Sequence, residues 1–190
     1  MGEVKFGSLL TDTTQPKDGL AAALARAKKE FPLLSGLDAV VQWGDGPGYA
    51  EFYPPDEARN PNPGRYTIEI RKKGMNPDDL FQTVAGDLFH AAQNASPRFK
   101  SAKAKFIKSM HPAQIKIARE MYAETIRRDT SDTRTFPEFL DQSAADAFIR
   151  SYIFKNKGVN KFIGGFPIRG GFFEQNLESL KEMEAALLAK

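Results

Sequence analysis

A short run in the middle of the chain, VAGDLFHAAQ at residues 84–93, holds residue types that can bind a metal and move a proton. In one common zinc site, two histidines four residues apart on a helix bind the metal, and a glutamate directly after the first histidine activates the bound water. Here Gly86 stands at the first histidine position, and Asp87 keeps the carboxylate on a shorter stem. Only His90 retains its role, so the run predicts a helix that has lost most of a catalytic zinc site.

The start of this helix carries clear sequence signals. Asn76 is suited to cap the first turn, and Pro77 is tolerated there because its missing N–H would have no helical partner. Asp78 and Asp79 favour the positive end of the helix dipole. The turn of about 100° per residue predicts two sides. The apolar side holds Leu80, Val84, Leu88 and Ala91, and the opposite side, directed to solvent or to a cleft, holds Gln82, Gly86, His90 and Gln93.

The elements around this helix predict an α+β fold. Residues 16–31 read as a helix, and residues 37–43 and 49–53 read as two strands joined in a hairpin by the turn GDGPG. A proline-rich loop at 54–64 leads to a third, alternating strand at 65–71. Further helices are predicted at 96–110, 111–129, 136–154 and 174–190. We expect a small three-stranded sheet packed with about six helices.

The element order resembles that of the zincin metallopeptidases over residues 37–150. In that family an edge strand precedes the active-site helix and lines the substrate cleft, and residues 65–71 occupy that place. In the gluzincin group a later helix supplies a glutamate ligand, often followed by an aspartate four residues on. Gln142 and Asp146 have the matching spacing, so Gln142 would replace the glutamate. Together with Gly86 and Asp87 this implies a pseudo-metallopeptidase that binds no metal.

An active metallohydrolase with atypical ligands is the alternative. Its zinc would be held by Asp87, His90, Gln142 and Asp146, with Asp87 as the catalytic base. The second histidine, His111, lies directly before Pro112 and is expected at a helix start rather than at a metal.

Composition excludes several other classes of site. The 190 residues include no cysteine, which rules out disulfides, thiolate metal sites and a cysteine nucleophile. No apolar run is long enough to span a bilayer, and the N-terminus lacks the pattern of a secretory signal, so we expect synthesis in the cytoplasm. The net charge of +3 does not by itself indicate nucleic acid.

One helix nevertheless has a basic surface that offers a second alternative, a small adaptor that binds nucleic acid. Its basic residues have no acidic neighbour in the sequence, although a solvated lysine face is the commoner explanation. They are Arg98, Lys100, Lys103, Lys105 and Lys108.

The least globular segment is the glycine-rich run KFIGGFPIRGGFF near the C-terminus. We divide the chain into a zincin-like domain at 1–155, a glycine-rich apolar arm at 156–173 and a terminal amphipathic helix at 174–190. The arm either folds onto its own core or contacts a partner. Its candidate contact residues are Phe162, Phe166, Arg169, Phe172 and Phe173.

These observations predict a non-catalytic structural or interaction protein that assembles through the arm. The run FPEFLDQSAADAFIRSYIF also resembles open reading frames carried by bacteriophages, and small cysteine-free zincin-like chains with an apolar arm resemble components of phage particles. That resemblance implies incorporation into a virion.

Overall fold

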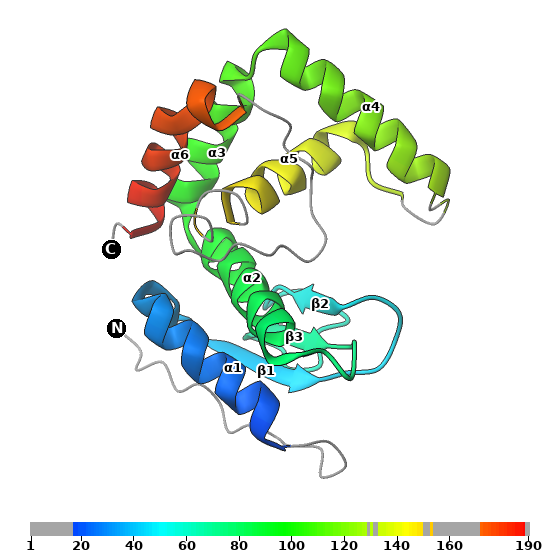
Figure 1. Ribbon diagram of the computed structural model, residues 1–190, viewed down its shortest axis with the longest axis vertical. Helices are drawn as coiled ribbons and strands as arrows, with labels where there is room; N and C mark the ends of the chain where they lie inside the picture. The colour runs from blue at the N-terminus through cyan, green and yellow to red at the C-terminus, as the bar shows by residue number, and fades with distance from the viewer. Residues whose placement is uncertain (1–16, 129, 131–132, 150–152, 154–171, 189–190) are drawn as a thin grey trace. The chain divides into compact units, whose positions relative to one another are not determined.

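The computed structural model describes residues 17–128, 130, 133–149, 153 and 172–188 (Figure 1). The chain divides into two compact units, with the division between Ala95 and Ser96. The predicted domain of residues 1–155 therefore includes parts of both units. Each unit is described by itself below.

The first unit contains a three-stranded mixed sheet in the order β1–β3–β2 (Figure 1). β1 (Ala39–Trp43) runs parallel to β3 (Tyr66–Ile70), and β2 (Ala50–Tyr53) runs antiparallel to β3. The prediction of a hairpin between residues 37–43 and 49–53 is wrong, because β3 lies between these two strands. The GDGPG run does change the direction of the chain. A five-residue turn is nonetheless long enough to cross one strand that lies between the two it joins, because neighbouring strands are only about 4.8 Å apart.

β3 is consequently the central strand, not the edge strand that the resemblance implied for residues 65–71. Its burial agrees with this position, since Thr67, Ile68 and Ile70 are all fully buried. The edge strands are β1 and β2. A clean alternation of apolar and polar residues shows that a strand has two different faces, but it does not show how many neighbours the strand has.

Two helices and a short 3₁₀ helix complete the first unit. α1 (Lys17–Glu30) and η1 (Pro32–Gly36) precede the sheet, and α2 (Pro77–Ala95) follows it. α2 packs on α1, on η1 and on all three strands. Phe31 links these elements, because its ring stacks on Phe81 at 6.3 Å and meets the edge of Phe89 at 5.0 Å. The apolar core of the unit thus gathers around α2.

The predicted start of α2 is confirmed. The side-chain oxygen of Asn76 accepts a hydrogen bond from the backbone N–H of Asp79 at 2.8 Å. The predicted opposite side of the helix is only partly correct, because Gln82 and Gln93 are buried and His90 is half-buried. The reason is the central position of α2, which is enclosed on more sides than a surface helix with a single apolar stripe.

The second unit is helical among its described residues. α3 (Pro97–Ser109) packs on α5 (Phe136–Ala147) and α6 (Phe172–Leu188), while α4 (Pro112–Arg128) packs chiefly on α5. The core contains the fully buried side chains Phe99, Phe106, Phe148, Leu180 and Met183. The whole described chain is therefore α+β, with six α-helices and one small mixed sheet, as predicted. None of the described helices is both long and apolar enough to span a membrane.

Candidate functional site

The altered metal-binding run lies on the second half of α2. Gly86, Asp87 and His90 are all half-buried. A Cβ atom added to Gly86 would meet no atom within 4 Å, so a larger side chain would fit at this position. Close to the end of the same helix, the hydroxyl of Tyr66 donates a hydrogen bond to the side-chain oxygen of Asn94 at 3.3 Å. Tyr66 also stacks on Phe52 of β2 at 5.8 Å.

The candidate zinc ligands come from two different units of the chain. Asp87 and His90 belong to the first unit, whereas Gln142 and Asp146 lie on α5 in the second. The side-chain oxygen of Gln142 already accepts a hydrogen bond from Arg134. Gly86 contributes no ligand atom, and a catalytic zinc site ordinarily needs three protein ligands. Within the described part of the chain, no three His, Asp or Glu side chains form a group that could hold a metal.

His111 lies at the start of α4, as predicted. Its Nδ1 accepts a hydrogen bond from the backbone N–H of Ala113 at 3.2 Å, and its own backbone N–H donates to Gln114 Oε1 at 2.9 Å. The imidazole therefore caps a helix terminus that would otherwise leave N–H groups without acceptors.

The basic surface predicted on α3 is partly neutralised by other helices of its unit. Lys103 Nζ lies 2.6 Å from Asp141 of α5, and Lys105 Nζ lies 2.8 Å from Glu182 of α6. Lys103 and Lys105 thus have acidic neighbours that are distant in the sequence. This arrangement favours a helix-packing role for α3 over a phosphate-binding one.

Most of the predicted arm lies outside the described residues. This includes Phe162, Phe166 and Arg169. The backbone of Phe172 and Phe173 forms the start of α6, so these two positions belong to the terminal helix and not to the arm.

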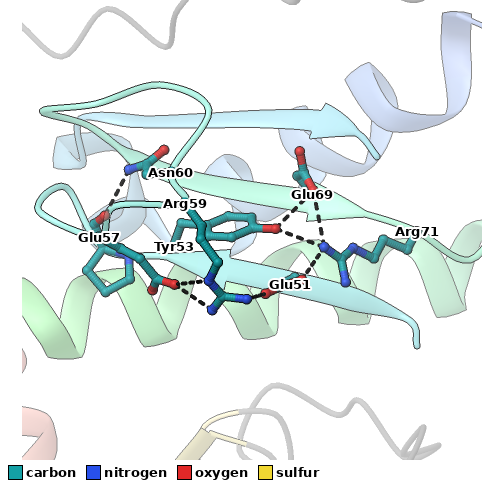
Figure 2. A network of polar contacts seen from close by, with 8 residues as sticks. Glu51, Tyr53, Glu57, Arg59, Asn60, Glu69 and Arg71 are labelled. Atoms are coloured by element: carbon teal, nitrogen blue, oxygen red, sulfur yellow. Dashed lines mark hydrogen bonds and ion pairs between the residues drawn. The ribbon is translucent and has the colours of Figure 1, made fainter. Parts of the chain in front are cut away.

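Among the described residues, an extended group of polar side chains occurs on the sheet instead, where side chains of β2 and β3 meet the guanidinium of Arg71 (Figure 2). Glu51 on β2 and Glu69 on β3 are directly opposite each other in the antiparallel register. The guanidinium of Arg71 forms ion pairs with both carboxylates through Nη2. The same nitrogen donates to the hydroxyl of Tyr53 at 2.8 Å. We call Glu51, Tyr53, Glu69 and Arg71 the sheet cluster.

The sheet cluster is extended on both sides. Tyr53 donates to Glu69 Oε2 at 3.3 Å, and Gln42 of β1 donates to Glu69 Oε1 at 3.2 Å. The exposed Arg59 lies 3.4 Å from Glu51 Oε1 and also pairs with Glu57. All three strands are therefore linked by polar side chains on this face.

The proline-rich loop at 54–64 is held in place by one buried side chain, that of Asn60. Asn60 Nδ2 donates to the carbonyl oxygens of Pro54 at 2.8 Å and Arg65 at 2.7 Å. Asn60 Oδ1 accepts from the hydroxyl of Thr67 at 2.7 Å. The side chain thereby supplies hydrogen bonds that proline residues cannot donate, and it ties the loop to β3.

Glycine permits the turn at 44–48 to approach the sheet cluster. A Cβ atom on Gly44 would lie 2.8 Å from Glu69, closer than side chains tolerate. Gly46 has a φ of 129°, and a Cβ atom there would lie 3.3 Å from the guanidinium of Arg71. Arg71 Nε is itself buried and has no hydrogen-bond partner among the described residues.

The electrostatics of the sheet cluster suit a structural or binding role. Burial raises the pKa of Tyr53 above its ordinary value, and the carboxylates of Glu51 and Glu69 raise it further. Tyr53 is thus a neutral hydroxyl at physiological pH and not a base or nucleophile. Both carboxylates are engaged by Arg71, so neither is positioned as a free acid or base.

Sequence reasoning did not identify the sheet cluster, although a signal for it was present. Glu51, Glu69 and Arg71 interrupt the apolar pattern of YAEFY and IEIR with charges of opposite sign. The correct strand pairing was needed to bring them together.

In comparisons with known proteins, no family model, curated protein or solved structure matches this chain.

Proposed function

We propose that this chain is a non-catalytic interaction protein with a zincin-like arrangement of strand and helix. The observation that carries the proposal is Gly86, which stands four residues before His90 on the half-buried part of α2 and offers no ligand atom. A hydrolase with this helix would need a metal to activate water, and Asp87 and His90 are too few to hold one.

The sheet order contradicts the edge strand expected at residues 65–71, so the zincin-like part of the proposal is restated here with β2. β2 is an edge strand, and it precedes α2 in the chain. It therefore takes the place that sequence reasoning gave to residues 65–71. The free side of β2 offers backbone groups to an extended partner segment, as edge strands do in other binding proteins.

The interaction itself is assigned to the glycine-rich arm at 156–173. The helices that precede and follow it in the sequence, α5 and α6, both pack on α3. The resemblance of residues 136–154 to phage-encoded chains suggests a virion as the place of assembly.

Metal analysis and a designed repair test the proposal together. We expect the purified parent chain to hold no stoichiometric zinc. A variant with Gly86→His, Asp87→Glu and Gln142→Glu should bind one zinc per chain, because these changes restore the ligands that the resemblance implies. Zinc at about 100 times its dissociation constant should then stabilise the variant by roughly 2.7 kcal/mol.

The matched control carries Gly86→Ala in place of Gly86→His and should bind no zinc. One zinc in the parent chain, lost in His90→Ala, would show that the active metallohydrolase is correct. Failure of the repaired variant to bind zinc better than the control would instead contradict the zincin-like arrangement.

A further inference from the structure

Helix α4 is incompletely packed within its unit. Ala118 is its one fully buried residue. The side that contacts α5 is defined by Tyr122, whose ring meets Phe136 at 5.7 Å and Phe139 at 5.3 Å. Its hydroxyl donates to the carbonyl oxygen of Arg134 at 2.7 Å. These contacts use one side of the helix and leave the side around Ile117 open.

The open side has an apolar centre. Ile117 is 44% exposed in the middle of the helix, and Met121, one turn later, is half-buried. Residues four apart lie on the same side of a helix, so the two side chains form a short continuous apolar strip. A large exposed side chain at the middle of a helix gains stability from any surface that covers it.

Two charged residues lie along one side of this strip. Lys116 and Glu120 are exposed, and each directly precedes one of the two apolar residues. They have opposite charges four residues apart, yet they form no ion pair with each other or with another described residue. The order of the two residues explains this, because a lysine that precedes a glutamate on a helix pairs less well than the reverse order.

We propose that this side of α4 is a homodimer interface, in which the helices of two copies pack antiparallel. In that orientation Ile117 of one copy lies against Met121 of the second copy, and Lys116 lies against Glu120 of the second copy. A two-fold axis repeats both contacts, so the same surface serves both partners. A parallel arrangement in register would place like charges together. The charge pattern therefore selects a second copy of this chain in the antiparallel orientation.

This interface is independent of the glycine-rich arm and of the metal-site arrangement. Each copy contributes one side of a single helix of 17 residues. The area that such a contact buries is small beside the roughly 1,000 Å² or more of a stable interface. We therefore expect a reversible dimer that dissociates on dilution, detected by sedimentation velocity of the full chain over a wide range of protein concentration.

Charge reversal provides the decisive experiment. Lys116→Glu places two acidic pairs across the interface, and Glu120→Lys places two basic pairs there. We expect each single reversal to raise the dimer dissociation constant about tenfold, and the double reversal to return it to within about threefold of the parent. Ile117→Asp should abolish the dimer. Each variant should keep the helix content and the melting temperature of the parent.

Lys181→Glu is the matched control, because Lys181 is an exposed lysine on another helix, α6, and forms an ion pair with Glu178 of the same helix. It should leave the dissociation constant unchanged. Any assembly through the arm affects the parent and every variant equally. Differences in the dissociation constant among them therefore report the contact made by α4. A parent that stays monomeric, or a double reversal that does not recover, overturns the proposal. So does an Ile117→Asp variant that loses thermal stability without changing mass, since that result means the chain covers this side itself.

Discussion

At the scale of single residues, Arg71 is the side chain that allows two carboxylates to face each other across the sheet. Its side chain is 15% exposed, and those of Glu69 and Glu51 are 15% and 24% exposed. Like charges directly opposite on neighbouring strands destabilise a sheet. Arg71 converts this pair into an attractive arrangement that also includes Tyr53, so the stability of the β2–β3 pairing depends on it.

Replacement of Arg71 by methionine should therefore destabilise the protein. Methionine keeps an apolar stem but leaves Glu51 and Glu69 without their shared cation. We expect the free energy of unfolding to fall by about 3 kcal/mol. This is near the low end for a broken buried ion pair, because water partly reaches these groups. The free energy of unfolding from urea titrations measures the effect.

Glu51→Gln and Glu69→Gln, added to the Arg71→Met variant, provide the matched control. With both charges removed, most of the lost stability should return, since the main cost is the repulsion between two carboxylates. Equal stability of the parent and the Arg71→Met variant would show that the sheet does not depend on the guanidinium.

Some properties of single residues could be predicted from the sequence and others could not. The cap at Asn76 and the position of His111 follow from local hydrogen bonding, which sequence neighbours determine. The burial of Gln93 does not, because it depends on what encloses α2 from other parts of the chain. The sheet cluster was missed for the same reason, since Glu51 and Glu69 meet only through the pairing of β2 with β3.

At the scale of elements, the helices were predicted well because their signals are local. α1, α2, α3, α4 and the start of α5 lie within a residue or two of the predicted bounds. The strands were also found, but their neighbours were not. Strand order depends on contacts between distant residues, and a turn signal does not specify whether the two flanking strands pair.

The start of α5 gives a pH-dependent prediction. The carboxylate of Glu138 accepts hydrogen bonds from the backbone N–H of Thr135 at 2.7 Å and from its hydroxyl at 2.8 Å. These two hydrogen bonds, that of the backbone first, hold the pKa of Glu138 below its ordinary value. The lowered pKa stabilises the fold above the pKa of the unfolded chain, and this contribution is lost as the pH falls through the folded pKa.

We therefore expect Glu138→Gln to be less stable than the parent at pH 7 and to approach it as the pH falls below about 4. Glutamine keeps a side-chain oxygen that can accept the same hydrogen bonds from Thr135. The difference in stability between the two proteins therefore reports the effect of the charge on Glu138. Melting temperatures of both proteins from pH 7 to pH 3 measure it. A difference that stays constant over this range would show that the charge of Glu138 does not contribute.

At the scale of the whole molecule, the chain is organised as two compact units, and the candidate zinc ligands are divided between them. The resemblance to zincins followed element order, which is a property of the sequence alone. Whether ligands from α2 and α5 converge depends on the packing of one unit on the other. This is why the repair experiment, which reports convergence directly, is the strongest test of that resemblance.

The role of the arm can be tested because the second unit has contacts that do not involve it. α6 is held on α3 by the fully buried Leu180 and Met183, by the ion pair between Lys105 and Glu182, and by a hydrogen bond from Ser96 to the carbonyl oxygen of Ala186. These contacts remain when the arm is changed. Replacement of residues 164–171 by a Gly/Ser segment of the same length also keeps the cost of closing the loop nearly constant.

We expect this replacement to leave the helix content and the melting temperature unchanged and to remove assembly beyond the α4 dimer. The physical reason is that Phe166 and its apolar neighbours would no longer be available for a second chain to cover. Circular dichroism and sedimentation velocity measure the two effects separately. Phe166→Ser in the otherwise unchanged chain is the matched control and should weaken assembly without removing the glycines. If the replacement lowers the melting temperature and the helix content together, the arm belongs to the core of its own chain, and assembly must use the edge of β2 or the surface of α4 instead.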